Sequence, residues 1–153
     1  MHKFSTRDLT LAALIAAVYA VLTVTLPIPQ YSGIQVRLAE ALTVLPFLFP
    51  AATPGLVVGC FIANLFSPFP LDILFGTAAT LFGCWATQYM PSRWLAPLPP
   101  VICNGILVGG LISYQEVGFT AAFGGTFLFN AATVALGELA VCYVLGLPLL
   151  AVM

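Results

Sequence analysis

The sequence predicts an all-α integral membrane protein with about six transmembrane helices, and two observations lead to this fold class. First, the 153 residues are 61% hydrophobic and only 6% Asp, Glu, Lys and Arg, with a mean hydropathy of +1.11. A soluble domain carries roughly 25% charged residues, because it must cover a surface that faces water. Second, the charges leave long uncharged stretches at 9–36, 41–71, 73–92, 94–115 and 117–137. Each can supply the roughly 20 apolar residues that cross a hydrocarbon core.

Proline residues and short polar sequences set the expected ends of the first three helices. The first, 6–26, ends at the Pro-Ile-Pro sequence, because a residue before proline is driven out of the helical conformation. The second, 36–49, ends at Pro50, and the third, 55–66, ends at the SPFP sequence. Both are short for a bilayer, so either they tilt or the pair forms a re-entrant hairpin.

The last three helices are bounded in the same way. The fourth, 71–89, runs from the SPFP break to the polar sequence MPSRW. Prolines precede the fifth, 100–113, and the polar SYQEVGFT turn separates it from the sixth, 124–147. With short turns between them, these six spans use the whole chain, so we expect a single transmembrane domain over residues 1–153.

Positive residues near short loops predict the orientation. Lys3, Arg7 and Arg93 fall on one side of the membrane when the chain crosses an even number of times. We therefore expect a multi-pass protein of the cell membrane with both termini in the cytoplasm. Arg37 is the one positive residue that departs from this rule.

Several kinds of chemistry are missing from the sequence. The four cysteines are widely spaced without a CxxC pair, and the single histidine is His2. Metal ions need clustered ligands, so we expect no metal site. There is no phosphate-binding loop and no nucleophile motif, so we do not expect the chain to hydrolyse ATP or to be an enzyme. With a net charge of -1, nucleic acid is not an expected partner.

Four charged residues fall inside or at the edges of the apolar spans, where an ionisable group usually faces a partner, a cavity or a ligand. Arg37 and Glu40 are three residues apart on one helical face and can form an ion pair. Asp72 begins a helix, so it serves either as a cap or as a ligand contact. Glu138 is the deepest of the four and has no basic neighbour in sequence, which favours a cationic ligand.

Amides add to this polar set. Asn64, Asn104 and Asn130 lie inside spans, and Gln35 borders an outer turn. Buried amides are destabilising unless they are paired. They either bond neighbouring helices or line a ligand site. Together with the carboxylates they predict one polar chamber, walled by Phe and Leu, that opens outward.

Small residues recur every four positions in the first span, at Ala12, Ala16 and Ala20. In lipid, such a strip lets another helix backbone approach closely. The strip is either a docking surface for another protein or a site of ordinary packing. Two GxxxG pairs, which begin at Gly55 and Gly105, are expected to pack internally.

Longer stretches resemble a known family. The sequences IQVRLAEALTVLP and PGLVVGCFIANL are the most specific, and LDILFGTAATLFG, PLPPVICNGILVG and ALGELAVCYVLGLPLL extend the similarity over roughly residues 7–150. They resemble the QueT family, whose members are substrate-binding S components of energy-coupling-factor (ECF) transporters. The resemblance implies an S-component-like bundle of six helices in a bacterial cell membrane.

The resemblance also implies partners and a cargo. S components capture a micronutrient from outside and dock, through the small-residue strip of the first helix, on an ECF transmembrane coupling subunit that works with two ABC ATPases. ATP is used by those ATPases, and no cofactor is expected on this chain. For QueT-like proteins the cargo is a queuosine precursor, a 7-deazaguanine such as 7-aminomethyl-7-deazaguanine, or queuine.

The polar residues suit such a cargo. A deazaguanine presents N1–H and its exocyclic amine as neighbouring donors, which one carboxylate can accept in a bidentate manner. We expect Glu138 or Glu40 to hold this edge, with Arg37 bracing Glu40, and Asp72 to attract the cationic aminomethyl group. The residues expected to serve the carbonyl and ring nitrogens are Asn64, Asn104 and Gln35.

Three alternatives stay open on the sequence alone. In the first, the chain is an S component for another vitamin, such as thiamin or riboflavin. In the second, it is a small membrane enzyme that acts on lipid, with Glu40, Asp72 and Glu138 as acid–base groups. In the third, it is a structural subunit that binds no small molecule.

Overall fold

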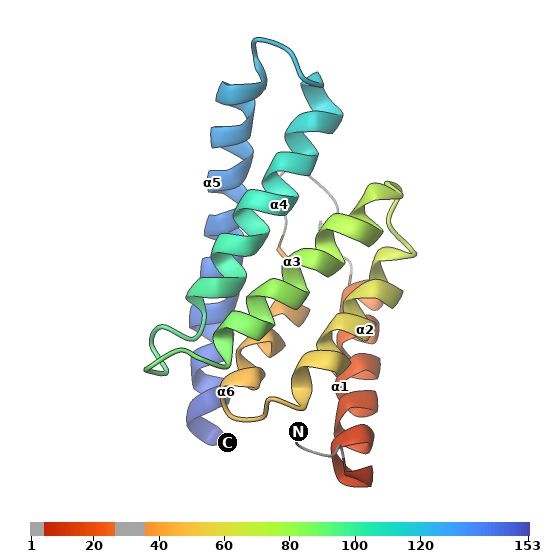
Figure 1. The fold of residues 1–153 in the computed structure, drawn as a ribbon, viewed down its shortest axis with the longest axis vertical. Coiled ribbons are helices and arrows are strands. Elements are labelled where there is room, and N and C mark those ends of the chain that lie inside the picture. Colours follow the sequence, from red (N-terminus) through yellow and green to blue (C-terminus); the bar gives the residue numbers. More distant parts are fainter. Residues whose placement is uncertain (1–4, 27–35) are drawn as a thin grey trace.

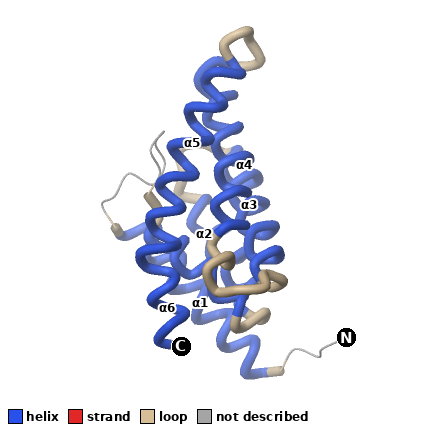
Figure 2. Tube along the Cα trace, turned by 90° about the vertical axis from the view of Figure 1, so that its left-hand side faces the viewer, coloured by secondary structure: helices blue, strands red, loops and turns tan. Residues whose placement is uncertain are grey.

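The computed structural model describes residues 5–26 and 36–153, and this part of the chain contains helices and no strand (Figure 2). In chain order the elements are α1 (Thr6–Thr25), the 3₁₀ helix η1 (Leu38–Phe47), α2 (Ala52–Asn64), α3 (Leu71–Thr87), α4 (Leu98–Val117), α5 (Phe123–Val141), the π-helix η2 (Cys142–Gly146) and α6 (Leu147–Val152). The last three follow one another as a continuous helical segment of 30 residues. The all-α fold class is confirmed.

The helices run back and forth between two ends of the bundle (Figure 1). α1 begins and α6 ends at the same end, where the connections 48–51 and 88–97 also lie. The α2–α3 and α4–α5 turns point toward the opposite end, and the α4–α5 hairpin projects beyond its neighbours. Because the first and last helices have their outer ends at the same end of the bundle, the chain runs along the bundle an even number of times.

Helix length separates the elements into two groups. α1, α4 and the segment 123–152 are long and apolar enough to cross a membrane. By contrast, η1 and α2 have 10 and 13 residues. At rises of about 2.0 and 1.5 Å per residue they each extend about 20 Å, which is less than the roughly 30 Å of a hydrocarbon core.

The second expected span, 36–49, is thus corrected: this segment forms the short 3₁₀ helix η1 rather than a membrane-spanning α-helix. Pro46 lies inside η1, where it cannot donate the backbone hydrogen bond that an α-helix would need. The third expected span, 55–66, begins earlier, at Ala52. Pro54 does not prevent this, because proline is tolerated in the first turn of a helix.

Two more expected ends also need correction. α4 continues through the SYQEV residues to Val117 and ends at Gly118, whose φ of +60° suits a glycine after a helix. The final helix does not stop at 147 but continues to Val152. Pro148 would clash with the carbonyl of the preceding turn in a regular α-helix, and the wider turn of η2 immediately before it makes room.

The outer surface of the bundle is apolar, unlike that of a soluble protein, and polar side chains are buried inside it. Leu128, Phe129 and Leu136 on α5 are 66–70% exposed. Glu40 and Asn64 are at most 1% exposed. Apolar residues cover the outside and polar residues lie inside, which is the arrangement of a helical bundle whose solvent is lipid.

Two glycines of α2 lie against the backbone of α1. A Cβ atom built on Gly55 would lie 2.3 Å from the carbonyl oxygen of Ala12, and one on Gly59 would lie 2.8 Å from that of Ala16. Only glycine leaves room for such backbone contact in these positions. The first GxxxG pair packs internally, as expected.

This contact corrects the interpretation of the alanine strip. Ala12 and Ala16 are each 7% exposed and face α2, so they do not form an outward docking surface. Ala20 is partly exposed, and the alanines that face outward on α1 are Ala13 and Ala17. The second GxxxG pair is also internal, with Gly109 against the backbone of α5.

Candidate functional site

Buried polar side chains from several elements meet inside the bundle. We call this set the polar centre; it comprises Tyr19, Arg37, Glu40, Glu138 and Cys142. All five are at most 5% exposed. They come from α1, the residue before η1, η1 itself, α5 and η2. Segments far apart in the sequence therefore build one site.

Irregular helix geometry surrounds this set. The 3₁₀ helix η1 packs against the π-helix η2, with the side chain of Val44 and the carbonyl of Ala41 close to Gly146. A Cβ on Gly146 would lie 3.0 Å from Val44 Cγ1. π-Helical turns occur often at functional sites, because they re-aim the side chains next to them. Here the π-helix begins at Cys142, four residues after Glu138 of α5.

Glu40 is held at three points. The hydroxyl of Tyr19 donates a hydrogen bond to its Oε1 atom. Its backbone carbonyl accepts a hydrogen bond of 2.6 Å from the Thr43 hydroxyl and lies 3.5 Å from Cys142 Sγ. Its other carboxylate oxygen, Oε2, is buried and has no hydrogen-bond partner in the described part of the chain.

The polar centre contains two carboxyl groups and one guanidinium. Arg37 lies close enough to Glu40 and Glu138 to interact electrostatically with both. Cys142 Sγ lies 3.8 Å from Glu138 Oε2 and so links the two acids through η2. Two carboxyl groups share one guanidinium, so with both acids ionised the polar centre carries an excess negative charge that a cation would neutralise.

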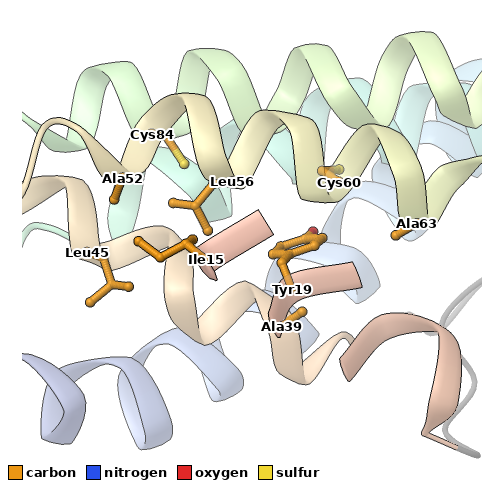
Figure 3. Close-up of a cluster of buried hydrophobic side chains, with 9 residues drawn as sticks. All are labelled: Ile15, Tyr19, Ala39, Leu45, Ala52, Leu56, Cys60, Ala63 and Cys84. Atoms are coloured by element: carbon orange, nitrogen blue, oxygen red, sulfur yellow. The ribbon is translucent and has the colours of Figure 1, made fainter. Parts of the chain in front are cut away.

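A second polar group lies beside the polar centre, around Cys60 of α2. The Nδ2 atom of Asn64 donates to Cys60 Sγ at 3.3 Å, and the Thr80 hydroxyl lies 3.1 Å from the same sulfur. Figure 3 shows Tyr19 extending from α1 toward α2, in the cluster that contains Cys60. Asn64 Oδ1 is buried without a partner among the described residues. Gly76 is needed here, because a Cβ on it would lie 2.7 Å from Asn64 Nδ2.

The other expected site residues are distributed differently. Asn104 is 3% exposed, and its Nδ2 atom has no partner in the ranges described. Asp72 accepts a hydrogen bond from Ser67 in the α2–α3 turn, and the Ser67 oxygen in turn accepts one from the backbone N–H of Phe69. Asp72 thus braces the α2–α3 turn, whereas no side-chain hydrogen bond caps the start of α3. Gln35 lies outside the described residues.

Asn130 bonds to a neighbouring helix, which is one of the two roles expected for a buried amide. It donates to Ser113 Oγ at 3.0 Å and to Glu116 Oε2 at 2.9 Å. These bonds join α5 to α4 close to the projecting hairpin. Asn130 therefore stabilises the contact between two helices.

Sequence reasoning missed Tyr19 and Cys142. Tyr19 follows Ile15 by one turn, and both are buried on the same face of α1, but an apolar span hides that register because its outer face is apolar too. Cys142 follows Glu138 by four residues, which is one helical turn. That spacing was the available signal for it.

Two cavities lie at the ends of the bundle. One of about 410 Å³ is at the end where α1 begins and is bordered by Asp8, Leu11, Leu48, Phe49, Pro50, Ala51 and Gln88. The other, of about 360 Å³, is an apolar groove between α3, α4 and the start of α5. Within residues 5–26 and 36–153, no group of three or more His, Cys, Asp or Glu side chains could hold a metal ion.

A bundle of helices with an apolar outer surface and a buried cluster of polar and ionisable side chains defines a helical membrane protein, in which such a cluster usually serves a partner, a cavity or a ligand. A family model described as "QueT transporter" matches residues 9–153. The chain therefore belongs to the QueT transporter family, and the resemblance noted from its motifs is confirmed.

One curated relative adds detail. The "Queuosine precursor transporter QueT" of Lactococcus lactis subsp. cremoris (strain MG1363) is 34% identical over 83 residues, which cover 53% of this chain and 49% of the relative. The match thus spans about half of that protein's length. No solved structure matches the chain.

Proposed function

We propose that this chain is the substrate-binding S component of an ECF transporter and that it captures a cationic 7-deazaguanine queuosine precursor. The observation that carries the proposal is a set of unpaired buried atoms. The described residues contain four buried side-chain polar atoms without a hydrogen-bond partner, and three of them are Glu40 Oε2, Asn64 Oδ1 and Asn104 Nδ2. An unsatisfied buried group costs about 1–3 kcal/mol, so a ligand that pairs with it gains that amount.

These three atoms complement the guanine-like part of the cargo. Glu40 Oε2 and Asn64 Oδ1 are acceptors, and both residues lie near Cys60. A deazaguanine offers two neighbouring donors, N1–H and the exocyclic amine. Asn104 Nδ2 is a donor, which the ring carbonyl oxygen needs. The family to which the chain belongs supports the same class of cargo.

Charge supports the cationic side chain of the precursor. Glu138 is the second carboxyl group of the polar centre, which has only one guanidinium among its five residues, so an aminomethyl cation would balance its charge when both acids are ionised. We assign this group to Glu138 rather than to Asp72, because Ser67 holds the Asp72 carboxylate in the α2–α3 turn.

The partners we propose are a transmembrane coupling subunit and two ABC ATPases, which would use ATP on behalf of this chain. The coupling subunit would dock on the outward face of α1, which contains Ala13 and Ala17, because Ala12 and Ala16 pack against α2. Both Arg7 and Arg93 belong to the end of the bundle where α1 begins. We place that end in the bacterial cytoplasm by the positive-inside rule.

Ligand titration of the purified chain in nanodiscs tests the proposal. We expect saturable binding of 7-aminomethyl-7-deazaguanine or queuine, and none of thiamin or riboflavin at the same concentrations. Binding of a vitamin without binding of any deazaguanine would overturn the cargo. Absence of binding by every compound would favour a structural subunit instead.

A further inference from the structure

Tyr19 reaches Glu40 from a rigid position. Its side chain is fully buried, and a Cβ on Gly59 of α2 would lie only 2.9 Å from Tyr19 Cβ. The α1–α2 contact therefore fixes the base of the side chain. Figure 3 shows the ring enclosed by its neighbours in the cluster, with Ala39 and Cys60 among them. A ring held in this way can offer its hydroxyl in one direction only.

The carboxylate that receives this hydroxyl is also fixed at its backbone. Thr43 and Cys142 hold the carbonyl of Glu40, so the side chain starts from a set position. A carboxylate with two free oxygens could present either of them to a ligand. Tyr19 occupies Oε1, and no other described residue bonds to Oε2, so only Oε2 can be presented to a ligand.

We propose that Tyr19 is a positioning residue, whose hydroxyl holds one oxygen of Glu40 so that the other oxygen is presented to the ligand. This inference rests on the proposed function. It also changes the expected recognition, because Glu40 then has one fully free oxygen for the two neighbouring donors of the ligand. The second acceptor is Asn64 Oδ1, which belongs to the group around Cys60.

Selectivity for ligands with two adjacent donors follows when one acceptor comes from Glu40 and the other from Asn64. A ligand with two adjacent donors satisfies both Glu40 Oε2 and Asn64 Oδ1. An analogue without the 2-amino group leaves one of these buried acceptors unpaired, and sites with unpaired polar groups reject such analogues strongly. Loss of the Tyr19 hydroxyl would let Glu40 rotate and use both oxygens, so this discrimination would weaken.

The experiment is a double-mutant cycle on the full chain in nanodiscs, with Y19F, E40Q and the double variant. Each is titrated with 7-aminomethyl-7-deazaguanine and with its analogue that lacks the 2-amino group. Tyr143→Phe is the matched control, because the Tyr143 hydroxyl also donates a hydrogen bond, to the Trp94 carbonyl at 2.8 Å, but outside the polar centre. Thermal unfolding without ligand measures the structural effect separately.

We expect Y19F to weaken binding of the aminomethyl compound by about five- to tenfold and to reduce the discrimination between the two compounds, whereas Y143F changes neither. In the E40Q background, Y19F should add less than about twofold, because its effect passes through Glu40. Full additivity of the two substitutions with unchanged discrimination would overturn the inference and show a merely structural role.

Two further outcomes keep the inference and the proposed function distinct. If the wild-type chain binds no deazaguanine, the proposed function fails. If the wild type binds but Y19F retains its affinity and discrimination, only the positioning inference fails. Should Y19F not fold, E40D replaces it, because the shorter side chain cannot keep the Tyr19 hydrogen bond and reach the ligand together. Wild-type discrimination in E40D would overturn the inference.

Discussion

Replacing Gly55 by alanine should push α1 and α2 apart. The new Cβ would lie 2.3 Å from the carbonyl oxygen of Ala12 and 2.9 Å from its Cα. Both atoms belong to the backbone, so no side chain can turn away. An ordinary contact begins near 3.4 Å, which requires the helices to separate locally by about 1 Å. Gaps of 0.5–1 Å already lose a quarter to a half of the dispersion attraction between facing atoms.

We expect G55A to destabilise the protein by about 2–3 kcal/mol, in the upper part of the range for overpacked sites. It should also weaken ligand binding, because α1 carries Tyr19 toward Glu40. The assay is reversible unfolding in mixed detergent micelles, followed by tryptophan fluorescence and combined with the ligand titration.

Gly125 provides the matched control. It lies inside α5, and a Cβ there would meet nothing within 4 Å. Alanine has the higher helix propensity by about 1 kcal/mol, so G125A should be neutral or slightly stabilising. Adding A12G to G55A should not restore stability, because the clash is with the backbone of Ala12. Equal unfolding midpoints for G55A and G125A would refute the close-contact reasoning.

Three further predictions concern the site and the outer face of α1. E138Q should weaken binding of the cationic 7-aminomethyl ligand by about tenfold or more, because it removes a carboxylate that the cation would pair with. Binding of the neutral 7-cyano analogue should change little. Calorimetric titration measures both affinities, and equal losses for the two ligands would contradict the charge argument. D72A should lower the unfolding free energy by about 1–2 kcal/mol, because it removes the acceptor of the Ser67 hydrogen bond, and it should leave the ligand affinity unchanged. A large loss of affinity with wild-type stability would return Asp72 to the ligand site. A17W should reduce copurification with the coupling subunit and spare ligand binding, and a complex that forms as before would move the docking surface elsewhere.

The membrane class and the set of polar residues were predictable from the sequence. Few charges and long uncharged stretches specify lipid as the solvent whatever the fold. Since buried polar groups are destabilising in lipid, Glu40, Asn64 and Asn104 could be selected without coordinates. Each of these three has a buried atom with no hydrogen-bond partner among residues 5–26 and 36–153.

The kind of helix was not predictable. Pro46 and Pro148 mark local departures from α geometry, but whether a chain responds with a break, a 3₁₀ turn or a π turn depends on what packs against it. Here η1 and η2 pack on each other, and their irregular turns bring Glu40 and Cys142 together. Likewise, the polar SYQEV residues predict a turn from sequence, whereas in the structure α4 continues through them to Val117 and ends at Gly118.

The sequence by itself determined the solvent of this protein and the short set of residues whose burial needs compensation. Only the tertiary structure decided which alanines of α1 face inward, and that Tyr19 rather than Asp72 belongs to the polar centre. The physical reason is that core and lipid are both apolar, so a membrane helix carries little pattern to distinguish its inner from its outer face. Backbone contact between Ala12 and Gly55 sets the rotation of α1, and that rotation aims the Tyr19 hydroxyl at Glu40.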